Sequence, residues 1–265
     1  TCLLTQAYRD ELIQESGGHP YVMKVLLGEV SRTGSAGSIQ RLTASQDRIL
    51  DALFERTWSS LSPAARRCLL TLSSWRSAVP RIALEAVLVR PANDRIDVEA
   101  AIEELRRFSF IESAVSSDDR EEFLWLPLVA FEFGRKKLAT APDRDDIRAD
   151  AKFLQRFGAN QKTDIPKGFE PALQRFAVVT GEKLGDDPRD FGEYRAILEY
   201  IACQYPPAWL LLSSLYEEAG GSDALESAVS AAKRFIEEAQ AGADPATAYK
   251  GWMRLAELWC RSGDR

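Results

Sequence analysis

Two short β-like runs interrupt a chain whose apolar periodicity is otherwise helical, and they constrain the fold more than any other feature. The runs FSFIESA (108–114) and EFLWL (122–126) flank the polar turn VSSDDRE, which is typical of a β-hairpin. Helical patterns precede this hairpin, and Pro127 opens the helix LVAFEFGRKKL directly after it. Helices, a hairpin and a closing helix form the order of a winged-helix domain.

Clear helix starts support this order ahead of the hairpin. An apolar stripe from Ile49 to Leu61 predicts a helix. Ser62 and Pro63 then combine an N-cap with a proline at the first helical position. Pro80 opens the short helix RIALEAVL, and Asp97 caps a fourth helix. That fourth helix is expected to point three side chains inward: Val98, Ile102 and Leu105.

The N-terminal part reads as two helices around the stretch ESGGHPYVMKVL (15–26). Leu4, Tyr8 and Leu12 are spaced as one helix face, and the glycines at 17 and 18 suit the end of that helix. Pro20 suits the first position of a second helix. Its inward side chains would be Val22, Val25, Leu26 and Val30. The segment RTGSAGS (32–38) reads as a linker.

After residue 141 the chain reads as all-helical and contains a weak repeat. Trp209, Leu212, Tyr216 and Gly220 recur, at the same spacing, as Trp252, Leu255, Trp259 and Gly263. This spacing resembles the first helix of a tetratricopeptide (TPR) repeat, although the offset between the copies exceeds the usual ~34 residues. We expect Trp58, Trp209 and Trp252 to be core residues.

Composition excludes several function classes. The net charge of −6 and the pI of about 5.1 do not favour nucleic-acid or membrane-surface binding. No apolar run approaches a membrane span, and the N-terminus lacks the pattern of a signal peptide. Because the sequence lacks an initiator Met, we expect it to be a fragment of a longer protein. The four cysteines are scattered without a CxxC pair, which favours buried thiols in a reducing cytosol over a zinc site.

The motifs of common catalytic sites are absent from the sequence. It holds no GxxxxGK[ST] phosphate loop, and His19 is the sole histidine. We therefore expect no catalytic residue, no metal site and no enzyme activity in this chain. The acidic residues 118–119 and 121–122 fit a solvated hairpin tip better than a carboxylate active site. Acids also outnumber bases in the fourth helix and in the turn, so duplex DNA would be repelled and protein contacts are favoured.

Three stretches in order resemble one family. SGGHPYVMKVL is similar to the Gly-x-Pro segment of the small helical domain in signal-transduction NTPases with numerous domains (STAND; NB-ARC/NACHT-like). LDALFERTWSSLSPAARRCLLTLSSW resembles the opening of the winged helix that follows in that family. IEELRRFSFIES and EEFLWLPLVAFEFGRKKL resemble its end. The resemblance implies that this chain follows an NTPase core, while a chain that never had such a core is the alternative.

The resemblance implies roles for a few residues. Pro20 would pack near the adenine of a bound nucleotide, and Gly18 would allow the close approach. A helix–helix corner without any ligand explains the same two residues equally well. The family often has a phosphate-sensing histidine at the start of the closing helix, where this chain has Leu126. Leucine donates no hydrogen bond, so direct phosphate sensing by the winged helix is in doubt.

The resulting prediction is a mainly α chain in four segments. They are a small helical segment with the Gly-x-Pro motif (1–45), a winged helix (46–140), a helical linker region (141–205) and truncated TPR-like repeats (206–265). The family implies a cytoplasmic switch in bacterial-type defence, innate immunity or signalling. Its repeats would bind a protein ligand, and the activated protein would self-associate. ADP or ATP would bind only with an NTPase core; a TPR scaffold and a STAND-linked transcriptional regulator remain alternatives.

Overall fold

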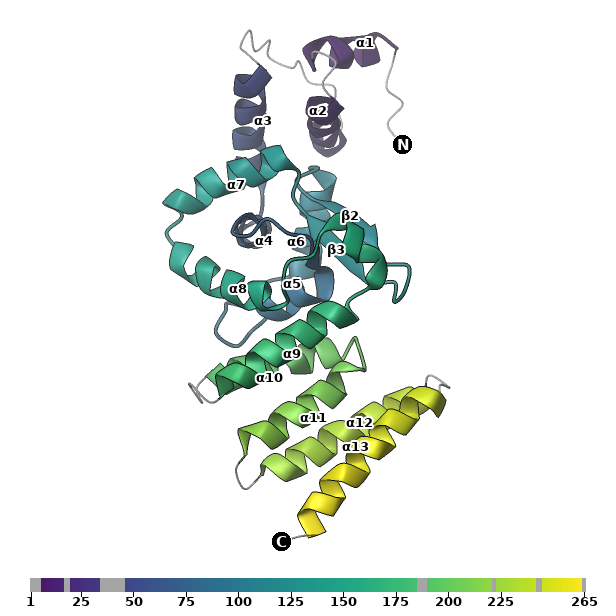
Figure 1. Ribbon diagram of the computed structural model, residues 1–265. Helices are drawn as coiled ribbons and strands as arrows, with labels where there is room; N and C mark the ends of the chain where they lie inside the picture. The colour runs from purple at the N-terminus through teal and green to yellow at the C-terminus, as the bar shows by residue number, and fades with distance from the viewer. Residues whose placement is uncertain are drawn as a thin grey trace. The chain divides into compact units, whose positions relative to one another are not determined.

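The computed structural model describes residues 6–16, 20–33, 46–184, 190–220, 223–241 and 245–263. Within these ranges the chain has thirteen α-helices and one small sheet of three strands (Figure 1). The predicted mainly α class, a winged helix with a small wing hairpin followed by helical repeats, is therefore confirmed. The chain forms two compact units: residues 1–76, 96–113 and 124–151, and residues 77–95, 114–123 and 152–265.

The first unit is built mainly from helices. Its elements are α1 (Gln6–Glu15), α2 (Pro20–Thr33), α3 (Gln46–Ser60), α4 (Pro63–Ser73), α6 (Val98–Arg107), α7 (Leu128–Thr140) and most of α8 (Arg144–Arg156). Ser62 Oγ accepts a hydrogen bond from the Ala65 N–H at 3.1 Å, and Asp97 caps α6 in the same way. These contacts confirm both predicted N-caps. The rings of Phe54, Phe110 and Phe133 lie together in the core of this unit.

The sheet contains the predicted hairpin and one additional strand. The hairpin strands are β2 (Glu112–Val115) and β3 (Glu122–Trp125), and β1 (Val79–Pro80) pairs with β3, giving the order β1-β3-β2. The sequence did not predict β1, because two residues show no periodicity. Pro80 still precedes a helix as predicted, since it is the N-cap residue of α5 (Arg81–Leu88).

The second unit holds α5, the hairpin turn and the C-terminal helices. Those helices are η1 (Lys162–Lys167, a 3₁₀-helix), α9 (Glu170–Leu184), α10 (Asp190–Ala202), α11 (Ala208–Ala219), α12 (Ala224–Ala241) and α13 (Pro245–Gly263). The predicted solvated hairpin tip is confirmed for Ser117, Asp118 and Arg120, which are exposed, but not for the residues beside them. Ser116 is buried, and the Asp119 carboxylate accepts a hydrogen bond from the Phe169 N–H at 2.5 Å. The turn thereby contacts the segment that begins α9.

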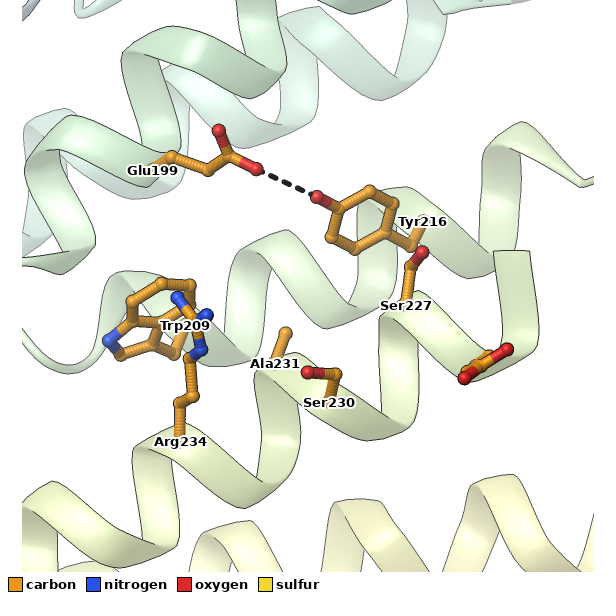
Figure 2. Close-up of a pocket in the computed structure, with 8 residues that line it drawn as sticks. Glu199, Trp209, Tyr216, Ser227, Ser230, Ala231 and Arg234 are labelled. Carbon is orange, nitrogen blue, oxygen red and sulfur yellow. Dashed lines mark hydrogen bonds between the residues drawn. The ribbon is translucent and has the colours of Figure 1, made fainter. Parts of the chain in front are cut away.

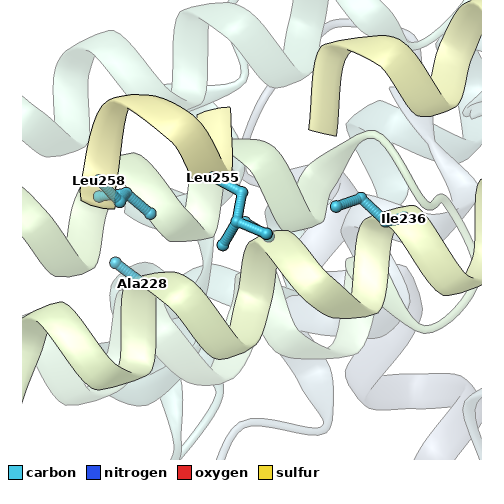
Figure 3. Close-up of a cluster of buried hydrophobic side chains, with 5 residues drawn as sticks. Ala228, Ile236, Leu255 and Leu258 are labelled. Carbon is cyan, nitrogen blue, oxygen red and sulfur yellow. The ribbon is translucent and has the colours of Figure 1, made fainter. Parts of the chain in front are cut away.

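Helices α11, α12 and α13 lie side by side (Figure 1). Ala228, Ile236, Leu255 and Leu258 form the core between α12 and α13 (Figure 3). Gly251 makes this close packing possible, because a Cβ there would lie 2.5 Å from Ile236 Cγ1. On the edge of the bundle, Glu217 of α11 accepts a hydrogen bond from Arg254 of α13 at 2.7 Å.

Two expectations about burial are wrong in this part of the chain. Trp209 is 4% exposed, as expected of a core residue, but Trp252 is 49% exposed. The repeat pattern sets the register of a helix face, whereas burial also needs a neighbouring helix to cover it. Similarly, Cys68 is buried but Cys203 and Cys260 are exposed thiols, and Cys2 lies outside the described residues.

Candidate functional site

The predicted nucleotide-side residues lie at the start of α2. Gly18 and His19 fall outside the described residues, while Pro20 is an exposed first residue of α2. Behind it three side chains are buried as expected: Val22, Val25 and Leu26; the side chain of Val30 is not described. The role of Pro20 at an adenine therefore stays a prediction. Leu126, half-buried, lies between β3 and α7.

A groove between α10, α11 and α12 offers a better-defined candidate site (Figure 2). Its volume is about 280 Å³, just below the ~300–1,000 Å³ of small-molecule and cofactor sites. That size suits a side chain or two of a bound polypeptide. The residues that line it are Glu199 of α10, Trp209 and Tyr216 of α11, and Glu226, Ser227, Ser230, Ala231 and Arg234 of α12.

Helix α11, which lines one side of the groove, ends at a glycine. Gly220 ends α11 with a positive φ of 67°, and its N–H donates to the Glu217 carbonyl. Only glycine adopts this conformation without strain. A short connection makes successive helices antiparallel neighbours. The backbone therefore sets which residues of α11 and α12 face each other across the groove.

Trp209 forms the floor at one end of the groove. Its indole Nε1–H donates to Glu238 Oε1 at 3.1 Å, which fixes the ring between α11 and α12. The guanidinium of Arg234 lies over the ring, with Cζ 5.0 Å from the centroid. This distance is within the ~6 Å range of cation–π attraction. The stack holds Arg234 in place while leaving the edge of its guanidinium open to the groove.

Tyr216 forms the other end. Its hydroxyl donates to Glu199 Oε1 at 3.0 Å, and Arg195 lies 3.6 Å from the same carboxylate. Burial, followed by the hydrogen bond to Glu199, raises the pKa of Tyr216 to about 12. The phenol is therefore a neutral donor at physiological pH. Phe191 packs edge-on against the Tyr216 ring and supports its position.

Sequence reasoning identified the two aromatic residues of this groove but not its polar ones. Ser227, Ser230 and Arg234 recur every three or four positions along α12, so they share one helix face. The apolar positions of α12, such as Ala228, Ala232 and Ile236, belong to the core instead. The separation of a polar face from an apolar face was the signal that the sequence offered for this site. It predicts which residues of α12 face solvent. It does not predict that α10 lies beside that face and closes a groove.

The described residues show no other obvious chemical site. None of their helices is both long and apolar enough to cross a bilayer. Within the same ranges, no three or more His, Cys, Asp or Glu side chains are grouped to hold a metal ion. The candidate site is thus a groove with an aromatic floor, both signs of charge and several hydroxyls. Such a groove can bind a ligand through contacts with the aromatic ring, ion pairs and hydrogen bonds.

The fold combines a winged helix with stacked helical hairpins. The helices α11 and α12 of that second part carry most of the groove. In structure the chain matches a Signal Transduction ATPase with Numerous Domains (STAND) protein with a tetratricopeptide repeat sensor from Pyrococcus horikoshii. The TM-score is 0.40 and the identity 13%, over 98% of this chain and 39% of that chain, so this chain spans well under half of that protein. No protein-family model and no curated protein matches the sequence. Function is therefore argued from the residues of this chain.

Proposed function

We propose that this chain is the regulatory and sensor region of a cytoplasmic STAND-type switch in bacterial-type defence or signalling. The helical repeats bind a protein trigger, and the winged helix holds the resting protein closed until the trigger shifts the balance towards self-association. The chain itself performs no catalysis; nucleotide hydrolysis belongs to an NTPase core in the full-length protein, which would also hold ADP or ATP.

One observation carries this proposal: partly buried polar contacts join parts of the winged helix to α10, the helix that precedes the repeats. Arg81 of α5 pairs with Glu85 at 2.7 Å and with Glu122 of β3 at 3.3 Å. Tyr200 of α10 donates to the other oxygen of Glu85 at 3.0 Å. Such networks have few alternative arrangements that satisfy every group. A displacement of α10 on ligand binding would therefore be transmitted to α5 and the hairpin.

The test begins with the sequence upstream of Thr1, where an NTPase core requires a P-loop within roughly 300 residues, about one or two domain lengths. The full-length protein is then purified with ADP, and its mass is followed by light scattering. Tyr200→Phe, which removes only the hydroxyl, should shift the balance between monomer and oligomer, whereas Tyr249→Phe, an exposed tyrosine of α13, should not. A full-length sequence without a P-loop in that upstream stretch would refute the switch.

A peptide-binding scaffold without a nucleotide switch is the second candidate. Leu126 at the sensor position favours it, because leucine cannot bond to a phosphate. Titration of full-length protein with ADP separates the two candidates: tight binding argues against a pure scaffold.

The STAND-linked transcriptional regulator is the third candidate, and the winged helix disfavours it. The N-cap Asp97 and the exposed acids of α6 would face DNA phosphates, and the hairpin turn is occupied by its contact with Phe169. Salt-dependent binding of this chain to duplex DNA would revive it.

A further inference from the structure

The groove along α12 has an acidic side chain at one end and a basic side chain at the other. Glu226 and Arg234 both line it, roughly two turns apart on the same helix. At ~1.5 Å of rise per residue the two positions are separated by about 12 Å along the axis. Figure 2 shows Arg234 beside Trp209 at one end and Ser227 beside Tyr216 at the other, with Ser230 and Ala231 between them.

The Arg234 end is prepared for a carboxylate. Its guanidinium is stacked on Trp209 and has no ion-pair partner among the described residues. Glu238, one turn further along α12, instead accepts the indole N–H of Trp209. Arginine is suited to a planar, bidentate contact with a carboxylate. Ser230, one turn away on the groove face, adds a hydroxyl donor.

The other end favours a cation. Glu199 and Glu226 both line it. Glu199 is partly neutralised by the Tyr216 hydroxyl and by Arg195, at 3.0 and 3.6 Å. Glu226 has no such partner among the described residues. An ammonium or guanidinium group placed here would form an ion pair with the Glu226 carboxylate, whereas a further anion would be repelled. This end therefore disfavours polyanions such as a nucleoside triphosphate.

We propose that the groove binds an extended peptide segment that carries an acidic and a basic side chain four residues apart. An extended chain rises about 3.3 Å per residue and points every second side chain to the same face. Side chains four residues apart therefore share a face and lie about 13 Å apart, close to the ~12 Å between the charged ends. The acidic side chain meets Arg234, the basic one lies beside Glu226, and the residues between them pass over Ala231. The inference rests on the proposed function, in which the repeats bind a protein trigger, and names the chemistry of the segment recognised.

The experiment uses a displayed library of random dodecapeptides, selected against the 265-residue chain. Enriched sequences should share an acid and a base four positions apart, in one fixed order. The same selection is run on Arg234→Glu and on the matched control Lys233→Glu, which makes the same charge change at an exposed neighbour outside the groove. Circular dichroism confirms that both variants fold.

Synthetic peptides with the enriched pattern should bind Arg234→Glu roughly tenfold or more weakly than wild type, since a charge-assisted hydrogen bond is lost and a repulsion added. They should bind Lys233→Glu nearly as well as wild type. The double variant Glu226→Arg with Arg234→Glu should select the reversed order of charges. Absence of enrichment, enrichment without the charge pattern, or equal binding by wild type and Arg234→Glu overturns the proposal.

This outcome is separable from that of the switch. The selection needs neither nucleotide nor an NTPase core, so a failed selection leaves the light-scattering test of the full-length protein standing. Conversely, the charge pattern found in a protein that never self-associates would make the chain a peptide-binding scaffold.

Discussion

The buried ion pair between α4 and α8 allows a quantitative test of the first unit. Arg67 donates to Asp150 Oδ2 from Nε at 3.2 Å and from Nη2 at 2.5 Å, and the Asp150 side chain is 0% exposed. The same guanidinium donates to Asp143 Oδ2 from Nη1 at 3.1 Å, but the Asp143 side chain is 43% exposed. One arginine thus has a buried and a solvated partner in the same unit.

The two partners should differ in what they contribute to stability. Removing one member of a buried pair costs ~3–5 kcal/mol, because the other charge stays buried. Arg67 keeps Asp143 as a partner, so Asp150→Asn should lie at the lower end, about 3 kcal/mol. An exposed pair is weakened by water and contributes ~0–1 kcal/mol. Asp143→Asn should therefore cost less than about 1 kcal/mol, although it removes the same charge.

Differential scanning calorimetry measures both variants and resolves separate transitions if the two units unfold independently. At ~2–4 °C per kcal/mol for a chain of this size, Asp150→Asn should lower the melting temperature of the relevant transition by about 6–12 °C, and Asp143→Asn by at most about 4 °C. Equal shifts for the two variants would refute the reasoning, because burial would then not govern the strength of these contacts.

Three further predictions concern the second unit. Burial, followed by neighbouring carboxylates, raises the pKa of Glu121. The ionisation of Glu121 therefore destabilises the fold as pH rises through that pKa. Glu121→Gln should raise the melting temperature at pH 7 but not below pH 4.5. Gly251→Val should cost ~1–3 kcal/mol in urea unfolding by overpacking α12 against α13, whereas Gly192→Ala, with open space around it, should stabilise α10 by up to ~1 kcal/mol. Burial raises the pKa of Glu217, but hydrogen bonds from two arginines of α13 outweigh it and lower this pKa below its ordinary value of 4.5. The ionised Glu217 therefore stabilises the fold above pH 4.5, and this stability should be lost as pH falls through the lowered pKa. Melting curves over a pH series should show a smaller loss in Glu217→Gln than in wild type.

Features encoded by neighbouring residues could be predicted from the sequence. The N-caps at Ser62 and Asp97 involve partners three residues away, so composition and order suffice to find them. The hairpin strands follow from alternation and a polar turn in the same way. The turn was predicted only in part: Asp118 and Arg120 are exposed as expected, but Asp119 bonds to Phe169, fifty residues further on. No local pattern records such a contact.

The groove shows the same limit. Trp209 and Trp252 occupy equivalent positions of the repeat, yet one lines a groove floor and the other is half-exposed. Only the packing of α12 and α10 around α11 distinguishes them. Arg234 carries no motif, and its role follows from the stack on Trp209. Helix faces are thus predictable from periodicity, whereas sites assembled from three helices are not.

The anchored hairpin turn has a consequence for protein engineering. Turns of this kind are ordinarily good places to insert an epitope tag or a fluorescent label, since exposed tips tolerate extra residues. Here an insertion beside Asp119 would pull its carboxylate away from the Phe169 N–H and expose the side chain of Ser116, which is buried in the intact turn. A label should instead be attached at Cys260, an exposed thiol on α13, after the other exposed thiol, Cys203, is replaced by serine. It then leaves the winged helix and the α9 segment undisturbed.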